Sequence, residues 1–328
     1  AVHFFYCYGN TFMTRPTASI IVPVYNRPLD IQRLLQRLSR QARQDFEVVI
    51  VDDCSDTPVQ DVVEGDDYPW ELSIIRHETN CGAGAARNTG IRNARGEIIV
   101  FIDSDADVPD ADWFEKFMYL YSEAGKMAEC AGCSRYVFHS DVFGIHTTIA
   151  GRVDTYSNWY GSCMVSSCRI TDRHVPMNNT AVARDIFEEI GMFSSNLHLG
   201  EDIEWCFRCL DQGVGLFFVP GAPIGHFDRN TPSDVWRHYY RIGEYSPVIR
   251  RLTRQSPYRL LFPEGGLSAF LLFFPMTVLM TLYIVKCWIR RDPFVVFFAP
   301  GLYMANVAYY LGMCKTITDN KMNLHADS

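Results

Sequence analysis

Acidic side chains gather in short segments of this sequence where their spacing could do chemistry. Asp52 and Asp53 end an apolar run in VDDCSD, where an Asp either accepts hydrogen bonds from a base or ribose or only caps the following turn. FIDSDADVP carries Asp103, Asp105 and Asp107 at alternate positions. Three such carboxylates repel one another unless a cation neutralises them, and hard oxygen ligands favour Mg²⁺ or Mn²⁺. We therefore expect a divalent metal here, with a purely structural acidic turn as the alternative.

A third acidic segment, LGEDIEWCFRCLDQG (199–213), has the pattern of a helix. Glu201 and Asp202 lie in its first turn, where carboxylates often only complement the helix dipole. The apolar spacing predicts an inward face made of Ile203, Phe207 and Leu210. The pattern alone leaves both roles open for the two acids.

Two further segments carry weaker signals. CGAGAARNTG (81–90) is glycine-rich and opens a helix, so its backbone amides and Arg87 can face a phosphate or a base. Its glycines do not form G-x-G-x-x-G, and it follows the third strand instead of the first, which argues against a dinucleotide site. VPGAPIGHF (219–227) predicts a short strand that carries His226, and a single His of this kind is more often structural than a ligand.

The elements that must position these residues follow an α/β pattern. From Ala18 onward, short β-branched runs alternate with amphipathic helices, which predicts a mostly parallel sheet. A helix that starts at Pro28 places four apolar residues on one face, and strands are expected at 19–24, 46–53, 72–77 and 97–105. The acidic segments end such strands, and ligands bind at the carboxyl ends of parallel strands.

Composition excludes several classes of protein. The 328 residues are 48% hydrophobic and 21% charged, so disordered, collagen-like and coiled-coil classes are excluded. The net charge of −8 argues against a nucleic-acid partner, which would need a broad basic face. Eleven cysteines are too few for a disulfide scaffold, so reduced thiols in a cytosolic setting are expected. The C-x-x-C pairs at 130/133 and 206/209 lack the context of a structural zinc site.

Hydrophobicity is concentrated near the C-terminus. Residues 267–285 and 294–312 are 19-residue stretches without a charge, long enough for membrane-embedded helices. The preceding segment, 236–262, has six Arg against a single acid, with Trp and Tyr between them, which suits an anionic headgroup region. A solvated arginine-rich helix is the alternative.

Two membrane topologies are compatible with these stretches. Lys286, Arg290 and Arg291 follow the first stretch, and the positive-inside rule opposes placing them across the membrane. Pro275 and Pro300 are expected to interrupt the two stretches near their middles, which favours re-entrant or monotopic helices. A transmembrane hairpin is equally compatible, and in both forms we expect the cytoplasmic side of the cell membrane.

Taken in order, the motifs resemble the inverting family-2 glycosyltransferases of the GT-A fold. The resemblance covers about residues 19–230, and its pieces are specific as an ordered set: SIIVPVYNR, EVVIVDDCSD, NCGAGAARNTGI, the DSD triplet, MNNTAVARDIFEEIGMF and GEDIEWCFR. It implies a nucleotide-diphospho-sugar transferase fold, with a Rossmann-like, mostly parallel sheet, helices on both faces, and C-terminal hydrophobic helices after it.

The resemblance also implies roles at the donor end of a site. Pro23, Tyr25 and Asp53 would bind the nucleotide, with Arg87 beside the base, and Asp103 would face the ribose. The donor would be a nucleoside diphosphate-sugar, most simply a UDP-sugar.

At the reacting end, the resemblance makes Asp105 a ligand of Mn²⁺ or Mg²⁺ and Asp202 the general base. His226 lies on a VPGA-x-x-x-H stretch like the one that supplies a further metal ligand in several members. The Q-x-x-R-W motif of processive polymer synthases is absent, which argues against a long polymer product.

The expected reaction is inverting transfer to a hydroxyl of a membrane-linked glycan or lipid at a membrane surface. A polyprenyl-phosphate synthase is the alternative, although its acceptor is already ionised and needs no base. An NAD-dependent oxidoreductase and an inactive membrane-anchored binding module are alternatives from other classes.

The expected organisation follows from these boundaries. Met13 is the expected natural start, just ahead of the first strand. An N-terminal extension (1–18) precedes a nucleotide-sugar-binding half (19–125) and an acceptor-binding half (126–235) of one domain. After these come the basic and aromatic juxtamembrane segment (236–262), the membrane-associated helices (263–312) and a tail (313–328).

Overall fold

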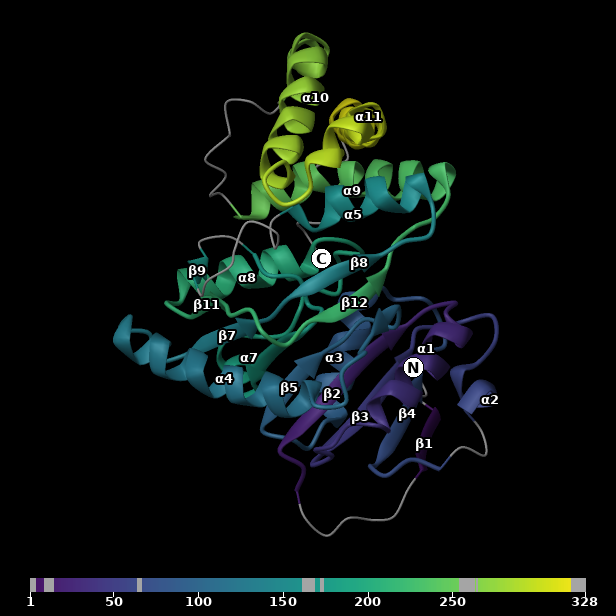
Figure 1. Ribbon diagram of the computed structural model, residues 1–328, viewed down its shortest axis with the longest axis vertical. Helices are drawn as coiled ribbons and strands as arrows, with labels where there is room; N and C mark the ends of the chain where they lie inside the picture. Colours follow the sequence, from purple (N-terminus) through teal and green to yellow (C-terminus); the bar gives the residue numbers. More distant parts are fainter. Residues whose placement is uncertain are drawn as a thin grey trace. The chain divides into compact units, whose positions relative to one another are not determined.

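The computed structural model describes residues 4–8, 15–63, 67–160, 169–171, 174–253, 263 and 265–319. The chain forms two compact units, and each is described by itself (Figure 1). The first unit consists of Ala1–Val142 and Ser167–His226, and the second of Phe143–Ser166 and Phe227–Ser328. The sequence-based domain boundaries stay predictions.

A nine-stranded sheet forms the centre of the first unit. In spatial order its strands are β1 (Phe4–Tyr8), β4 (Leu72–Arg76), β3 (Phe46–Asp52), β2 (Ala18–Val24), β5 (Ile98–Phe101), β10 (Thr180–Ala183), β7 (Tyr136–His139), β11 (Gly215–Phe218) and β9 (Arg169–Thr171).

The predicted parallel sheet is confirmed. Strands β4, β3, β2 and β5 are mutually parallel, and Ile21 lies opposite both Val49 and Phe101. The antiparallel strand β10 continues the sheet between β5 and β7. Strand β1, which pairs antiparallel with β4, was not predicted.

Helices cover both faces of this sheet (Figure 1). Helix α4 (Trp113–Cys130) packs Phe114 against Phe46 of β3, with ring centroids 4.7 Å apart. Side chains alternate along a strand, so Val49 faces the opposite side and belongs to the core beneath α3 (Ala83–Asn93), α7 (Arg184–Ile190) and α8 (Glu201–Asp211). Helix α1 (Pro28–Leu38) buries the predicted stripe of Ile31, Leu34, Leu35 and Leu38, and the short α2 spans Val59–Val63.

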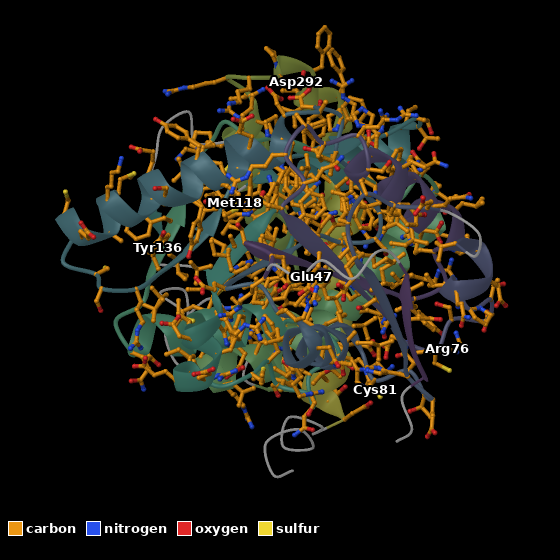
Figure 2. All side chains as sticks on the ribbon, turned by 90° about the horizontal axis from the view of Figure 1, so that it is seen from below. Glu47, Arg76, Cys81, Met118, Tyr136 and Asp292 are labelled. Carbon is orange, nitrogen blue, oxygen red and sulfur yellow. The ribbon has the colours of Figure 1, made fainter. Side chains whose placement is uncertain are left out.

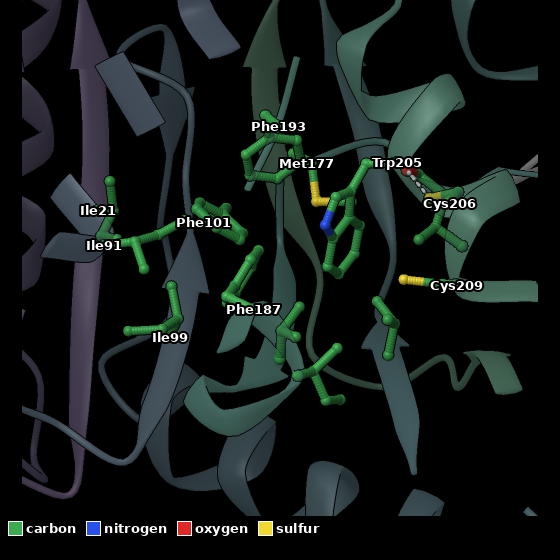
Figure 3. Close-up of a cluster of buried hydrophobic side chains, with 14 of the residues drawn as sticks. Ile21, Ile91, Ile99, Phe101, Met177, Phe187, Phe193, Trp205, Cys206 and Cys209 are labelled. Carbon is green, nitrogen blue, oxygen red and sulfur yellow. Dashed lines mark hydrogen bonds between the residues drawn. The ribbon is translucent and has the colours of Figure 1, made fainter. Parts of the chain in front are cut away.

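Helix α8 turns a different face inward from the predicted one. Its buried side chains are Glu201, Trp205, Cys206 and Cys209, whereas the predicted residues Ile203, Phe207 and Leu210 are only partly buried. Trp205 stacks on Phe187 at 4.9 Å in the core that Figure 3 shows. The buried stripe at i, i+4 and i+8 is Glu201, Trp205 and Cys209. Because it begins with a carboxylate, a search for apolar periodicity does not detect it.

Burial makes the two cysteines of α8 poor metal ligands. It raises the pKa of Cys209 to about 12 and that of Cys206 further above its usual value. Both thiols are free and lie among apolar side chains of the core.

The second unit is mainly helical. It contains α5 (Ile149–Asn158), α9 (Pro232–Thr253), α10 (Gly266–Trp288), the 3₁₀ helix η2 (Pro293–Phe298) and α11 (Ala299–Thr318). Asp292, labelled in Figure 2, accepts hydrogen bonds from Arg152 and Tyr156 and so ties α5 to the α10–η2 connection. The strand β8 (Val142–Ile145) runs from the first unit into the second.

Glycines allow α9 and α11 to touch backbone to backbone. A Cβ atom on Gly243 would collide with the carbonyl oxygen of Tyr309, and one on Gly312 with that of Tyr240. Lys315 Nζ also lies 2.7 Å from Glu244 Oε1 across the same pair of helices. Helix α11 is thus fixed along the arginine-rich helix.

Three details of the C-terminal prediction need correction. Helix α10 runs through Pro275 without interruption, and Pro300 lies in the first turn of α11, where a proline is well tolerated. Tyr239 is buried, with Trp236 partly buried, in a cluster that includes residues of α11, so these aromatic side chains are used for packing within the unit. Arg254, Tyr258 and Arg259 lie outside the described residues.

Candidate functional site

The acidic triplet lies just beyond β5, where the backbone turns. Strand β5 ends at Phe101 instead of the predicted 105, and Ala106 N–H donates to the carbonyl of Asp103 at 3.0 Å. Because of this turn the three carboxylates do not share one face. Asp107 accepts a hydrogen bond from Arg37 Nε at 2.9 Å, so it is held by an arginine and needs no metal.

A two-residue strand brings the two predicted metal ligands together. Strand β6 (Ala106–Asp107) pairs with β12 (Ile224–Phe227), and His226 lies opposite Ala106. His226 Nε2 is 3.4 Å from Asp105 Oδ1. An imidazole nitrogen and a carboxylate oxygen at this separation can both bind one octahedral Mn²⁺ or Mg²⁺, so these residues fit such an ion.

Arg27 is a further member of the site. Its Nη2 lies 3.3 Å from Asp105 Oδ2, and its Nη1 donates to Asp30 Oδ2 at 3.1 Å. Both oxygens of Asp105 are thus contacted by basic side chains. A guanidinium here can neutralise Asp105 without a metal, and it is well placed to meet the anionic end of a ligand.

A buried ion cluster joins the two sequence halves of the first unit. Arg87 donates to Glu201 Oε1 at 2.6 Å and to Asp103 Oδ1 at 3.0 Å. Burial, together with the neighbouring charge of Asp202, raises the pKa of Glu201 to about 7, although Arg87 opposes this shift. Desolvation likewise raises the pKa of Asp103.

Two buried donors in this cluster have no hydrogen-bond partner in the described part of the chain. They are Arg87 Nε and Asn178 Nδ2. Asn178 also accepts from the backbone N–H of Asp103 through its Oδ1 at 3.1 Å, so its amide lies beside that residue. Unpaired buried donors are costly, and a bound ligand with oxygen acceptors would satisfy them.

Glycine permits the close approach that builds this cluster. A Cβ atom on Gly84 would lie 2.9 Å from Glu201 Cγ and 3.1 Å from the carbonyl oxygen of Ser194. The first turn of α3 therefore packs directly against the loop that leads into α8. This contact brings Arg87 within reach of Glu201.

Asp202 and Glu201 are adjacent in the sequence but lie in different environments. It lies at the N-terminus of α8, partly exposed, and its Oδ1 accepts from the N–H of Ile203 at 2.8 Å. Glu201 points inward to Arg87, so of the two acids only Asp202 can meet a ligand from solvent.

The residues predicted for the nucleotide lie at the ends of β2 and β3. Pro23 is the penultimate residue of β2, and Tyr25, just after that strand, is 50% exposed. Asp53 is buried, and its carboxylate accepts from the N–H groups of Cys81 and Gly82. Its visible contacts therefore order the loop in front of α3.

Comparison with known proteins identifies the family. The family model described as glycosyl transferase family 2 matches residues 19–191, just over half of the chain. The chain belongs to glycosyl transferase family 2. It is a glycosyltransferase that uses a nucleotide-sugar donor, and this decides against both the NAD-dependent oxidoreductase and the inactive binding module.

Named relatives agree with this assignment. The chain is 28% identical to the glycosyltransferase AglE of Haloferax volcanii over 247 residues, 74% of this chain and 77% of the relative. It is 24% identical to the pre-mycofactocin glycosyltransferase of Mycobacterium tuberculosis, over 77% of this chain but only 52% of that protein. A mannosyltransferase from Pyrobaculum calidifontis, solved with GDP-Man and Mn²⁺, shares the fold with a TM-score of 0.59 at 17% identity, covering 94% of this chain and 88% of that one.

Sequence reasoning missed three residues of this candidate site. Arg27 follows the first strand in a loop, and no pattern marked it as a partner of Asp105. Asn178 lies in the MNN motif, which was noted only for its place in the family order. Glu201 was paired with Asp202 as a helix-terminal acid, although its spacing from Trp205 and Cys209 indicated an inward side chain.

Replacing Arg87 by Met should destabilise the transferase in a pH-dependent way. The change leaves Glu201 and Asp103 without their buried cation, and breaking such a group typically costs about 3–5 kcal/mol. The raised pKa of Glu201 means that its protonated form favours folding; this contribution is complete below the usual Glu value and is lost as the pH rises through about 7. Without Arg87 that pKa rises further, so the deficit should grow from mildly acidic to mildly alkaline pH.

Urea unfolding of the variant and the parent at both ends of that range measures the deficit. Arg92→Met, an exposed position on the same helix, is the matched control and should change stability little. A deficit that is the same at both pH values would contradict the assigned role of Glu201.

Proposed function

We propose that this transferase moves a sugar, with inversion at the anomeric carbon and with bound Mn²⁺ or Mg²⁺, from a nucleoside diphosphate-sugar to a hydroxyl group of a membrane-linked glycan or lipid. The observation that carries the proposal is the 3.4 Å approach of His226 to Asp105, together with a partly exposed Asp202 whose neighbour Glu201 is joined to Asp103 through Arg87. This set supplies a metal-binding pair and a separate carboxylate base, which is what inverting transfer to a hydroxyl requires.

The donor end of the proposal rests on the residues around β2, β3 and α3. Tyr25 would stack on the base, with Pro23 and Asp53 shaping its pocket and Arg87 ordering Asp103 for the ribose. The unpaired N–H groups of Asn178 and Arg87 would meet donor oxygens. A UDP-sugar is the simplest candidate, and GDP-Man, present in the P. calidifontis complex, is the second.

At the reacting end, the chain's own groups divide the work. Asp105 and His226 would hold the divalent ion, which supplies positive charge beside the departing diphosphate. Arg27 would add a second cation on the same side. Asp202 would take the proton from the acceptor hydroxyl as its oxygen attacks the anomeric carbon from the face opposite the leaving group. Inversion follows from a single displacement without a sugar–enzyme intermediate.

A screen of donors tests this proposal. The full chain is heated with UDP-, GDP- and dTDP-sugars, each with Mn²⁺, Mg²⁺ or EDTA, and the Tm and the release of nucleoside diphosphate are measured. One donor should raise the Tm and be hydrolysed slowly, and only with metal, because bound ligand stabilises the native state. Stabilisation by every nucleotide equally, or undiminished hydrolysis in EDTA, would contradict it.

A membrane surface is part of the proposal. The helices Gly266–Trp288 and Pro293–Thr318 are long and apolar enough to cross a membrane, and most of their apolar windows are not buried within the protein. Phe270 is 80% and Phe274 67% exposed on α10, while Lys286, Arg290 and Arg291 are exposed after them. Apolar insertion beside basic groups suits an anionic leaflet, and the cytoplasmic side would give access to a lipid-linked acceptor.

Charging the exposed face of α10 should weaken membrane binding. The double variant Phe270→Asp/Phe274→Asp loses the transfer of two aromatic rings, about 1.5–3 kcal/mol each, and adds two charges that resist insertion. Flotation with vesicles containing anionic lipid should show at least a tenfold lower bound fraction. Tyr119→Asp, at a position 63% exposed on α4, is the matched control and should float like the parent. A parent chain that stays monomeric and unbound without detergent would contradict the membrane proposal.

A further inference from the structure

A second cluster of metal-ligand side chains lies outside the acidic triplet. Among the residues that the structure describes, Asp53, His77 and Cys81 form a group whose ligand atoms all lie within 4.8 Å of one another. They come from three places: the end of β3, the residue after β4, and the loop before α3. Asp53 and His77 are buried, and Cys81 is half-buried.

From this geometry we propose that Asp53, His77 and Cys81 bind Zn²⁺ at a site distinct from the Asp105 site. Asp53 is shared with the proposed base pocket, so zinc and the nucleotide would compete for it. The donor set of one oxygen, one imidazole nitrogen and one sulfur suits zinc, whereas Mg²⁺ prefers oxygen alone. Zinc bond lengths of about 2.0–2.3 Å put tetrahedral ligands roughly 3.3–3.7 Å apart, so separations of up to 4.8 Å must shorten by about 1 Å, and His77 Nδ1 and Asp53 Oδ1, now hydrogen-bonded, must separate by about 0.6 Å.

The surroundings already hold each ligand in orientation. His77 Nδ1 lies 2.7 Å from Asp53 Oδ1, and its Nε2 lies 2.9 Å from Thr89 Oγ1. When Nε2 carries the proton and donates to Thr89, Nδ1 is left as a ligand. The N–H groups of Cys81 and Gly82 donate to Asp53 and would keep its carboxylate fixed while one oxygen binds the metal.

The third proposed ligand is the thiol of Cys81. The hydrogen bonds of Cys81 Sγ are long, 3.3 Å to the carbonyl of Thr79 and 3.6 Å to its hydroxyl. Binding converts the thiol to a thiolate and releases one proton to solvent. A cavity of about 310 Å³, lined by His77, Cys81 and Thr89 among others, provides an entry path and room for water as the fourth ligand. Figure 2 labels Cys81.

Titration of the full chain with Zn²⁺, and with Cd²⁺ as a spectroscopic probe, tests the site. The Asp105→Asn chain serves as the parent in this titration, because Mg²⁺ cannot exclude Zn²⁺ from a site that contains His226. No sugar donor is added, so the outcome does not depend on the proposed transfer reaction. The parent should bind one Zn²⁺ per chain, and Cd²⁺ should give a thiolate charge-transfer band. Cys81→Ser should remove the band and weaken Zn²⁺ binding by about 10²-fold or more.

The control is Cys54→Ser, because that thiol lies on the adjoining loop and donates to the carbonyl of Glu78. It should bind like the parent. In the unmodified chain Zn²⁺ should also protect Cys81 from alkylation, read by mass spectrometry, which needs no variant to fold. Equal binding by Cys81→Ser, loss of the band in Cys54→Ser, or alkylation of Cys81 at the same rate with and without Zn²⁺ would each overturn the proposal.

Discussion

Asp202→Asn should lower turnover by about 10²–10⁴-fold while the donor still binds with its normal affinity. Asparagine keeps the shape of the side chain and can still meet the N-terminus of α8, but it cannot accept a proton. The acceptor hydroxyl would then have to lose its proton without help as the donor bond breaks. Transfer kinetics and donor titration calorimetry separate the two quantities.

Two variants of α8 sharpen this result. Asp211→Asn removes an exposed carboxylate at the far end of the same helix and should leave turnover unchanged. Glu201→Gln should mainly lower stability, because Glu201 is buried against Arg87 and does not reach the acceptor. Near-normal turnover of Asp202→Asn would remove the base from the mechanism and favour an acceptor that is already ionised, such as a polyprenyl phosphate.

Asp105→Asn should abolish detectable transfer and weaken donor binding in the presence of Mn²⁺. The variant loses a charged metal ligand, and the metal's charge stabilisation is worth several kcal/mol, so a loss of about 10³-fold or more in kcat/KM is expected. Mn²⁺ binding, measured directly by calorimetry or electron paramagnetic resonance, should fall in parallel.

Asp107→Asn is the matched control for this change. Asp107 belongs to the same acidic triplet but is bound to Arg37, so Mn²⁺ binding and transfer should survive its replacement. An equal loss of Mn²⁺ binding and transfer in both variants would mean that the triplet acts as one acidic cluster. It would contradict the proposal that Asp105 and His226 bind the metal as a pair.

The parts of the fold that the sequence predicts best are those where one face alone is apolar. Apart from Pro28 and the exposed Leu29 in its first turn, helix α1 has apolar residues only at its stripe positions, and the predicted four are the buried four. Helix α8 has apolar residues all round, so periodicity could not choose between Ile203 and Trp205 as the inward position. The parallel strands were found because each is a continuous β-branched run buried on both faces.

Site residues could be predicted where a local motif marks them. They could not be predicted where their role depends on a contact with a residue far away in the sequence. Asp105, His226 and Asp202 could be named from motifs, but the contacts of Arg27 with Asp105 and of Arg87 with Glu201 depend on how distant segments pack, which no local pattern encodes. Grouping Asp107 with Asp103 and Asp105 assumed an extended strand through 105. The chain turns after Phe101, and that turn sends Asp107 to Arg37.

The contact between Arg87 and Glu201 also has a consequence for synthesis of the chain, because 114 residues separate the two. At about 5–20 residues per second, a ribosome needs roughly 6–23 s to add them. For most of that interval, until β10 (Thr180–Ala183) is made, β5 has no neighbour on one side, and an unpaired strand edge can recruit other chains. Until Glu201 is added, Arg87 and Asp103 lack the contact that completes their ion cluster. The nascent first unit is therefore most vulnerable to aggregation in this window, and a chaperone that covers β5 should raise the yield of folded enzyme.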